Sequence, residues 1–589
     1  MRFTRRWVRL FAMIIAVCLL LPLVRVNTGH DAGASVSVPF RPQFTTLRVG
    51  LFFGSTALPS ANLQNADGFG RGFDFGFFDS NRNFVPIGAW TNEHRITMLM
   101  ARNVVWHPTA SEGRGEFREG TSGAVVVGSF HVKFSQGFAT FEEARTIASQ
   151  HQGGFVRYQS ASQDPFFVMV GNHTSRASAE SALAAFGAAN VEVFSGTQHS
   201  IKVVRTGTNA ILFEFDAGTT PFGIMPRSIA GEDPETWFHG FRYHGGFSYA
   251  RRDGGLLTVL NYVDIEDYVK GILPYEMSPT WPIEALKAQA LTARTFAVRS
   301  IGRHASQGFD LCVDVHCQVY RGRGHANDRT DQAVTGTRGM YVTFEGRPAE
   351  TVYASSNGGA SENVENVWME PRPYLRGVLD PWEAYVVRRI QGYNWTVRHT
   401  PAALTERLRT RISGFNLSTV AAVRVTERSA TGNAIGVTIT DVNGRTHTLR
   451  GRSQILAGLG TPTLRFDIGD AIWSPGNIFA NSPAIPVNPG TQIFGVDGSG
   501  QAVAVASADM RAINGEGNSV AVAGEGSPGI GGGTGLVSGQ FVINGTGNGH
   551  QVGMSQWGAF AMAHYHNLTF RDIIHFYFTN VEITETYQG

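Results

Sequence analysis

The stretch Asp267-Tyr-Val-Lys-Gly-Ile-Leu-Pro-Tyr-Glu-Met277 and the run from Ser278 to Ile301 organise the rest of the chain. The second run repeats apolar and alanine residues at helical spacing, and Pro282 suits its first helical position. A face so narrow and rich in alanine lets another backbone approach closely. The spacing therefore predicts a central, buried helix directly after Glu276.

Glu276 has apolar and aromatic neighbours on both sides, namely Pro274, Tyr275, Met277 and Trp281. Such surroundings desolvate a carboxylate in part, which raises its pKa and makes it a proton donor near neutral pH. For an isolated glutamate, a helix cap without a chemical role is the more common interpretation. Local sequence therefore leaves both interpretations of Glu276 open.

The composition is that of a globular protein with an ample core. The chain has 589 residues, of which 42% are hydrophobic and 16% charged, and its formal net charge is +2. The length suggests three or four domains. A net charge near zero argues against a nucleic-acid partner.

The N-terminus has the layout of an export signal. Four arginines within the first nine residues precede an apolar run from Leu10 to Val24. This layout predicts a secretory signal or a short uncleaved anchor over residues 1–34, with Ala32-Gly-Ala34 as the best cleavage site. The sequence therefore predicts an exported, extracytoplasmic protein that contacts the membrane only through this segment, if the segment is not cleaved.

Two cysteines belong to the exported part, Cys312 and Cys317, because Cys18 lies in the apolar run. In an oxidising exterior they can close a small loop as a disulfide. His316 lies between them and His304 lies eight residues upstream of Cys312, so two thiolates and two imidazoles could instead hold a tetrahedral zinc ion. We favour a closed, structural zinc site, and the disulfide stays open as the alternative.

Five blocks of the chain resemble the stage II sporulation protein D (SpoIID) family and stand in the family's order. They are Glu266–Met277, Trp281–Phe296, Phe309–Tyr320, Tyr353–Glu362 and Gly547–Ala559. The resemblance implies an α+β, multidomain chain with a catalytic module built around the central helix and flanked by strand-rich subdomains. It also implies a lytic transglycosylase of bacterial peptidoglycan, with Glu276 as the catalytic acid and a metal at the block that contains Cys and His.

The same blocks contain the candidate substrate-binding residues. A hairpin over 339–356 that ends in the Gly358-Gly359 turn is expected to expose hydroxyl and carboxylate groups, which suit a sugar. Trp368, Tyr374 and Trp382 follow at intervals, and aromatic faces can stack on sugar rings, although core packing explains each of them as well. The candidates are Tyr275, Lys287, Arg294, Ser355, Ser356, Glu362, His550, Ser555 and Gln556.

One position departs from the family's pattern in the last block. The run Gly547-Asn-Gly-His-Gln-Val-Gly-Met-Ser-Gln556 has Gln551 where the family has a glycine. A side chain there could narrow the site or alter the backbone angle. This departure concerns the expected substrate contacts of His550 and Gln556 more than it concerns Glu276.

Residues 123–204 carry an internal repeat of strand, helix and strand. The first half runs from His131 to Gln159 and the second from Phe166 to Phe194. This βαββαβ pattern resembles the sporulation-related repeat (SPOR) domain, which implies binding to glycan strands that have lost their stem peptides. A spacer domain without a ligand is the alternative, because short units of this kind host many functions.

The remaining segments complete the predicted domain order. Residues 45–122 form an N-terminal strand-rich region, whose first strand, from Thr45 to Ser55, is expected to pair far downstream. Residues 205–466 form the first part of the catalytic module and residues 540–589 its C-terminal block. The Gly-rich segment 467–539 between them is expected to be an insert or linker, with weak strand alternation from Gln501 to Ala506.

The number of carboxylates in the family's signature determines the expected mechanism. Hydrolysis of a glycoside usually needs two, whereas a lytic transglycosylase can use one, because the C6 hydroxyl of the same N-acetylmuramic acid closes a 1,6-anhydro ring. The expected partner is therefore the glycan strand, in sporulation or in wall remodelling, with a cell-wall amidase as a further candidate. Two alternatives stay open: a modifier of an amidase that cuts no glycan, and an anchored glycan-binding scaffold.

Overall fold

The computed structural model describes residues 40–586, except for 112–113, 161, 185, 187–189, 229–230 and 369, and between 470 and 538 it describes only short strands. The predicted export segment and most of the Gly-rich insert therefore lie outside the described residues. Within the part that is described, no helix is long and apolar enough to cross a membrane. The mixture of helices and strands confirms the α+β fold class.

A seven-stranded sheet joins the start of the described chain to the entry of the predicted catalytic module. Its order is β20-β1-β19-β18-β15-β3-β4. The first strand, β1, pairs with β19 and β20, so the expectation of far-downstream pairing is confirmed. The strands are β1 (Thr46–Phe52), β3 (Phe73–Phe78), β4 (Phe84–Thr91), β15 (Phe222–Pro226), β18 (Gly246–Arg251), β19 (Leu257–Asp264) and β20 (Leu311–Cys312).

A ten-stranded sheet contains the predicted βαββαβ unit at one end. The unit has the expected order of elements, β9 (Phe130–Phe138), α2 (Phe141–Ala148), β10 (Gly154–Gln159), β11 (Phe166–His173), α3 (Arg176–Ala184) and β12 (Val191–Ser195). The sheet continues beyond it, because β10 pairs with β14 (Ile211–Asp216) in parallel. The further strands are β13 (Ile201–Arg205), β5 (Arg95–Met100), β2 (Ser60–Asn65), β16 (Thr236–Phe238) and β17 (Phe241–Tyr243). The SPOR resemblance stays a prediction.

Helix α5 (Ile283–Arg299) is the buried, alanine-rich helix that the spacing predicts. Its alanines at 285, 288, 290, 293 and 297 have no exposed surface. Small side chains allow close packing, and α5 contacts α4 (Ile265–Glu276), α6 (Asp328–Thr335), α10 (Gln556–His566), α11 (Phe570–Tyr577) and β21 (Met340–Phe344). Two details differ from expectation, since Pro282 is the N-cap residue rather than the first helical one, and Glu276 ends a helix of its own.

The predicted hairpin over 339–356 is only partly present. Strand β21 pairs with β22 (Arg347–Pro348) and with β38 (Glu582–Glu585). The next strand, β23 (Tyr353–Ala354), instead pairs in parallel with β37 (Met554–Ser555). This pairing brings two of the family-like blocks together, although almost two hundred residues of sequence separate them.

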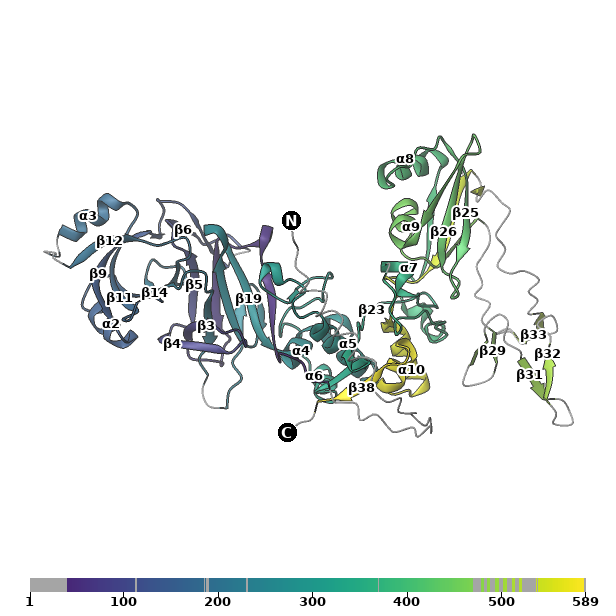
Figure 1. Ribbon diagram of the computed structural model, residues 1–589, viewed down its shortest axis with the longest axis horizontal. Helices are drawn as coiled ribbons and strands as arrows, with labels where there is room; N and C mark the ends of the chain where they lie inside the picture. Colours follow the sequence, from purple (N-terminus) through teal and green to yellow (C-terminus); the bar gives the residue numbers. More distant parts are fainter. Residues whose placement is uncertain are drawn as a thin grey trace, which may run out of the picture. The chain divides into compact units, whose positions relative to one another are not determined.

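A further set of elements lies between these two blocks. Helices α8 (Pro401–Arg411) and α9 (Gly451–Leu459) pack against a sheet of β25 (Val420–Arg428), β26 (Ala434–Asp441) and β27 (Thr446–Arg450), as Figure 1 shows. Beside them, β24 (Asn394–His399) and β28 (Phe466–Ile468) pair with β36 (Gln540–Thr546). The chain therefore returns from the Gly-rich insert into the sheet that it left.

The other described elements are short. Strands β6 (Val104–His107), β7 (Glu116–Glu119) and β8 (Val126–Val127) form a small sheet. Within the insert, β32 (Ala502–Val505) coincides with the predicted alternation and pairs with β31 (Ile493–Val496). The others there are β29 (Ile478–Ala480), β30 (Ile485–Val487), β33 (Arg511–Ile513), β34 (Ser519–Ala521) and β35 (Leu536–Val537).

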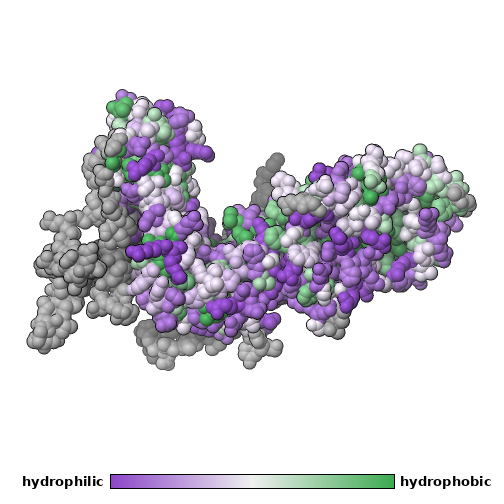
Figure 2. Space-filling model, turned by 180° about the vertical axis from the view of Figure 1, so that it is seen from behind, coloured by the Kyte–Doolittle hydropathy of each residue, from purple (hydrophilic) through white to green (hydrophobic). Residues whose placement is uncertain are grey.

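Large apolar side chains at the surface are few and scattered. Figure 2 shows hydrophilic and hydrophobic residues interspersed on the visible face. Val315 is 90% exposed and Trp368 is 44% exposed. Single exposed apolar residues are normal on a folded protein, so these two gain interest only from their position beside the cavity described next.

Candidate active site

Glu276 is the last residue of α4 and lines a cavity of about 650 Å³. This volume is in the range of ligand-binding clefts. The loop after β20 forms part of the lining with His316, Cys317, Gln318 and Val319. The opposite side comes from two turns far away in sequence, which contribute Tyr353 to Ser355 and Asn548 to His550. The cavity therefore assembles four of the five family-like blocks, together with Phe296 from the remaining one.

Three donors hold the Glu276 carboxylate. The side-chain amide of Gln556 donates to Oε2 at 3.2 Å, and the Tyr353 hydroxyl and the backbone of Val319 also bond to the carboxylate. Burial raises the pKa of Glu276, and these three hydrogen bonds act against that rise. A raised pKa keeps a fraction of the carboxyl protonated at higher pH than usual, which a general acid requires.

Two other carboxylates line the cavity, and both pair with Arg372. The guanidinium lies 3.5 Å from the Glu350 carboxylate and also contacts the Glu370 carboxylate. Glu276 has no such ion pair among the described contacts and is held by hydrogen bonds instead. Among the residues that line this cavity, Glu276 is therefore the carboxyl suited to proton donation.

His550 lines the cavity, but its ring nitrogens are used by the backbone. Nε2 lies 2.8 Å from the carbonyl oxygen of Tyr353 and must donate to it, while Nδ1 accepts from the backbone N–H of Val552 at 3.1 Å. Burial lowers the pKa of His550 to about 4, so the imidazole is neutral near pH 7. The ring of Trp368 contacts it, with centroids 5.0 Å apart. His550 therefore lines the cavity and packs against Trp368, and it does not carry protons.

The structure brings some predicted site residues to the cavity and places others elsewhere. Glu276, Ser355, His550 and Gln556 line it. Trp368 also lines it, whereas Tyr374 is buried and Trp382 packs against His566. The predicted residues that do not line it are Tyr275, Lys287, Arg294, Ser356, Glu362 and Ser555.

The expected exposure of Ser356 and Glu362 was wrong. Both are buried, because the Gly358-Gly359 turn folds inward onto polar side chains. Ser356 donates to Glu383 at 2.9 Å. Glu362 accepts hydrogen bonds from Ser429, Asn433, Asn366 and the backbone of Asn363. These two side chains hold the turn instead of facing a ligand.

The other four residues also have partners within the fold. Arg294 is fully buried, and its guanidinium donates twice to Glu266, at 2.9 and 2.6 Å. Lys287 pairs with Glu284 at 2.8 Å, and Tyr275 stacks on the ring of His325. Ser555 caps α10 by accepting from the Gly558 N–H at 3.0 Å, and its hydroxyl donates to Glu383. Their geometry fits support of the site rather than contact with a substrate.

Gln551 does not line the cavity, and its backbone has the conformation that a glycine at this position would adopt. Its φ is +64°, in the left-handed region that favours glycine. Its side chain is fully buried and turns away from the cavity. The amide accepts from the Leu464 N–H at 2.7 Å and donates to the Asn357 carbonyl at 3.0 Å. Gln551 therefore ties the two turns of the cavity to the segment that precedes β28.

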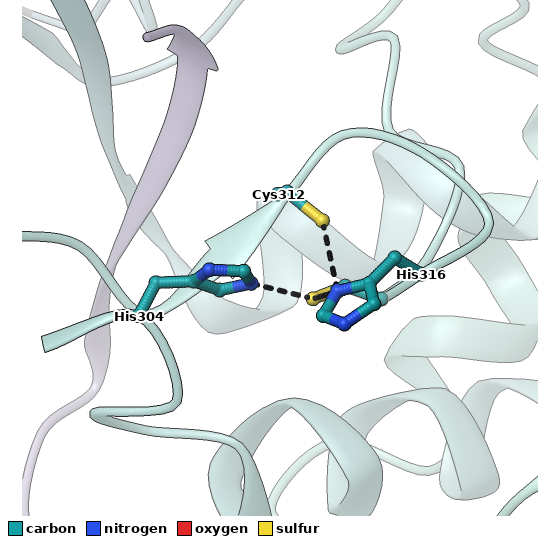
Figure 3. A group of neighbouring side chains, drawn as sticks. His304, Cys312 and His316 are labelled. Atoms are coloured by element: carbon teal, nitrogen blue, oxygen red, sulfur yellow. Dashed lines mark hydrogen bonds between the residues drawn. The ribbon is translucent and has the colours of Figure 1, made fainter. Parts of the chain in front are cut away.

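Four predicted metal ligands lie together at the edge of the cavity. The donor atoms of His304, Cys312, His316 and Cys317 all lie within 4.8 Å of one another (Figure 3). His304 Nε2 lies 3.3 Å from Cys317 Sγ, and His316 Nδ1 lies 3.6 Å from both sulfur atoms. Ligands of tetrahedral zinc are separated by about 3.5 Å, given bond lengths of about 2.0–2.3 Å. Both cysteines are free thiols, and this donor set fits zinc.

A second group of potential ligands fits an ion-pair network better. Asp233, His244 and Asp267 have donor atoms within 4.8 Å of one another. Asp267 already pairs with Lys270 at 2.9 Å, and Asp233 lies 3.3 Å from His244. The Lys270 ammonium already pairs with one of these carboxylates. This group therefore has fewer ligand atoms available for a metal than the cluster of Cys and His has.

Sequence reasoning missed three polar side chains around Glu276, those of Tyr353, Gln318 and Gln289, and the backbone N–H of Val319. Gln318 donates to the Tyr353 hydroxyl at 3.1 Å, which leaves that hydroxyl to donate to Glu276. Gln289 accepts from Gln556 at 3.5 Å. All four lie inside the family-like blocks, and that membership was the available signal, because none of them is next to Glu276 in the sequence.

Comparison with known proteins also points to the SpoIID family. Residues 253–344 match the family described as SpoIID, Stage II sporulation protein. A protein named Stage II sporulation protein D from Bacillus subtilis is 29% identical over 220 residues, which cover 35% of this chain and 60% of that protein. An uncharacterized protein of Brachyspira hyodysenteriae is 28% identical over 373 residues, which cover 62% of this chain and 78% of that protein.

Over this stretch the chain is similar to SpoIID proteins. Glu276 and the four predicted metal ligands lie within the matched residues. A protein named Amidase enhancer from Bacillus subtilis is also similar, with 36% identity over 107 residues, which cover 18% of this chain and 14% of that protein. The SpoIID match ends before the two turns that complete the cavity, so Tyr353 and Gln556 are placed at the cavity by the structure alone.

Proposed function

We propose that this chain is a peptidoglycan lytic transglycosylase that cuts denuded glycan strands between N-acetylmuramic acid and N-acetylglucosamine. The observation that carries this proposal is a half-buried Glu276 with a raised pKa in a cavity whose other carboxylates are paired with Arg372. One protonatable carboxyl without a second free carboxylate favours an intramolecular nucleophile over water.

In the proposed reaction, Glu276 first donates its proton to the glycosidic oxygen while the bond from that oxygen to C1 breaks. The resulting carboxylate then accepts the proton of the C6 hydroxyl of the same N-acetylmuramic acid, and O6 bonds to C1 to close the 1,6-anhydro ring. No water is consumed, and Glu276 ends protonated again. Gln556 and Tyr353 stabilise the carboxylate between the two steps, because each donates a hydrogen bond to it.

Substrate binding is assigned to the groups that face the cavity. Trp368 presents an exposed ring to a sugar face, and Ser355 presents a hydroxyl. We also propose the βαββαβ unit as a second glycan-binding region, in line with its SPOR resemblance. Two sites for one polymer raise the effective concentration of the strand at the cavity.

Zinc is proposed as a structural ion held by His304, Cys312, His316 and Cys317. When bound, it would cross-link the loop that carries Gln318 and Val319, the partners of Tyr353 and Glu276. The N-terminal segment is proposed to export the chain to the wall or to hold it at the membrane, facing the wall. The role is assigned to sporulation or to wall remodelling.

A second candidate is a modifier that stimulates a cell-wall amidase without cutting glycan. The similarity to a protein named Amidase enhancer favours this candidate. The glutamate and its three donors favour the enzyme, because a binding module has no need of a carboxyl with a raised pKa in its cavity.

Mass analysis of purified glycan strands after incubation with the chain tests these candidates. The proposed enzyme yields ends of 1,6-anhydro-N-acetylmuramic acid. If the new ends are hydrolysed rather than anhydro, the chain is a glycosidase and not a lytic transglycosylase. If the strands stay intact and the chain accelerates an amidase in a mixed reaction, the chain is the modifier and not the enzyme.

A further inference from the structure

Glu383 is a fully buried carboxylate outside the family-like blocks. It lies on a 3-10 helix, Trp382–Tyr385, and accepts hydrogen bonds from the two turns that complete the cavity. From the first turn come the Ser356 hydroxyl at 2.9 Å and the backbone N–H groups of Asn357 at 2.6 Å and Gly359 at 3.0 Å. From β37, which follows the second turn, comes the hydroxyl of Ser555.

These contacts lead directly to the donor of Glu276. Ser555 is the N-cap of α10, and the next residue, Gln556, donates to Glu276. The backbone N–H of Trp557 donates to the Ser355 carbonyl at 3.1 Å, so the start of α10 is also bonded to the first turn. One carboxylate therefore connects both turns at the point where α10 begins.

We propose that Glu383 is a positioning residue of the Glu276 site, which fixes the two turns so that Gln556 donates to Glu276. The inference rests on the proposed function only for its effect on catalysis, since the hydrogen bonds exist independently of the reaction. A carboxylate suits this task because all four partners are donors, and only an ionised acid offers acceptors to every one of them.

Burial raises the pKa of Glu383, and the hydrogen bonds from its four donors act against that rise. Asp380, three residues earlier, is also buried, with 2% of its surface exposed. Its carboxyl accepts a hydrogen bond from the Tyr577 hydroxyl at 2.6 Å. Burial and the negative charge of Glu383 raise the pKa of Asp380 to about 8, so the neutral form of Asp380 dominates at pH 7. The neighbouring carboxyl thereby avoids placing a second charge beside Glu383.

The test follows the pKa of the Glu276 carboxyl itself. The full chain is labelled with carbon-13 at the glutamate carboxyl carbons, and the Glu276 resonance is assigned by its absence in Glu276→Gln. Titrations compare the natural chain, Glu383→Gln, Gln556→Ala and the double variant. Glu383→Gln is expected to raise the pKa of Glu276, as Gln556→Ala does, because the carboxylate loses a donor.

The double variant separates positioning from a general loss of stability. If Glu383 acts through Gln556, the two shifts do not add, and the double variant titrates like Gln556→Ala. Full additivity, or an unchanged Glu276 pKa in a folded Glu383→Gln variant, overturns the proposal. If Glu383→Gln does not fold, Ser356→Ala is used instead, because it removes a single donor to Glu383. A raised Glu276 pKa in that variant supports the proposal, and an unchanged Glu276 pKa overturns it.

A matched control uses a buried glutamate in a different part of the fold, the ten-stranded sheet. Glu214 of β14 is fully buried and bonded to Arg157, so Glu214→Gln also removes a buried charge from its partner. It should lower the unfolding temperature and leave the Glu276 titration unchanged. A shift in this control equal to that in Glu383→Gln would mean that any destabilisation moves the site.

The other titratable and charged groups at the cavity also have to be considered. These are Tyr353 of β23, Arg303, His316 and Cys317 near the loop after β20, His550, and the Arg372 ion pairs. None of them is altered in the series. With glycan as substrate, Glu383→Gln should lower turnover by about a hundredfold through misplacement of the site. If the natural chain cuts no glycan, the proposed function fails, while the titration still decides the role of Glu383.

Discussion

The two sides of the cavity use polar residues for different purposes. On the side of α4 and the loop after β20, the carboxyl of Glu276 lines the cavity and the Cys and His donor atoms lie close to one another. On the side of the two turns, most polar residues bond to the protein itself, as Ser356, Glu362 and Gln551 do. On the side of the two turns, a polar residue in a family-like block is therefore mostly a sign of support.

The backbone explains the difference. Turns rich in glycine contain N–H and C=O groups that no helix or sheet satisfies, and burial makes unpaired groups costly. The carboxylate of Glu383 and the amide of Gln551 satisfy such groups at Asn357 from both directions. On the other side, α4 and α5 satisfy their own backbones, so Glu276 is left free for other roles.

The largest effect should come from Glu276→Gln. The amide is nearly isosteric but cannot donate a proton to the glycosidic oxygen, so cleavage of purified strands should fall by on the order of a hundredfold or more. Glycan binding should persist. The measurement is the rate at which 1,6-anhydro ends form.

Glu370→Gln is the matched control for this change. Glu370 lines the same cavity but pairs with Arg372, so its loss should alter the cleavage rate only severalfold. Cleavage at the natural rate by Glu276→Gln would remove Glu276 from the mechanism and end the distinction between the two sides.

Loss of a metal ligand should have the next largest effect, and mainly on stability. Cys312→Ser should reduce the zinc content of the purified chain from about one ion to near zero and lower the free energy of unfolding by roughly 3 kcal/mol or more. Metal analysis and thermal unfolding measure both. Val315→Ala changes an exposed side chain in the same loop that offers no ligand, so it should leave the zinc content unchanged.

The contrary outcome for the metal site is clear from the mass of the intact chain. A mass two protons below that of the free thiols, with no metal, would establish the disulfide between Cys312 and Cys317. The loop would then be closed by a covalent bond, and chelators would not affect its stability.

The same substitution on the two sides should change stability with opposite sign. Burial raises the pKa of Glu276 in the folded state, so the folded state binds more protons than the unfolded state between the two pKa values. Stability from this group is therefore lost as pH rises through the raised pKa. Glu276→Gln removes that loss and should be more stable than the natural chain at pH 7, with the difference vanishing below about pH 4.

Glu362→Gln should instead destabilise the protein. Glu362 accepts five hydrogen bonds inside the fold, and an amide leaves some of those donors unpaired. A cost of about 2 kcal/mol is expected at pH 7. Thermal unfolding of both variants from pH 4 to pH 8 checks the signs, and equal signs would contradict the division into a chemical side and a supporting side.

Local periodicity predicted the helical part of the site well. The alanine spacing of α5 and the signature around Glu276 depend on residues close in sequence, and both are present in the structure. The cluster of Cys and His also spans only a short segment, from His304 to Cys317. Such features can be predicted because helix periodicity and short loops determine which side chains meet.

The supporting side could not be predicted, because its partners are far apart in sequence. Gln556 lies 280 residues from Glu276, and Ser555 lies 172 residues from Glu383. A hydroxyl or carboxylate in a glycine-rich turn has the same sequence pattern whether it faces a sugar or a buried N–H. Only the pairing of β23 with β37 decides which of the two it does.

The smallest effect, and the sharpest test of the supporting side, concerns Gln551→Gly. Gly restores the residue of the family pattern and fits the φ of +64° without strain, so the change removes the side chain and relieves the backbone. Against that relief, the Leu464 N–H and the Asn357 carbonyl lose buried partners. A net loss of about 1 kcal/mol is expected, and Gln551→Ala, which keeps the strained φ, should lose more. Chemical unfolding of both variants measures this order. A Gly variant as stable as the natural chain would mean that the hydrogen bonds of Gln551 merely offset its backbone strain, and that the turns are held by Glu383 and Glu362 alone.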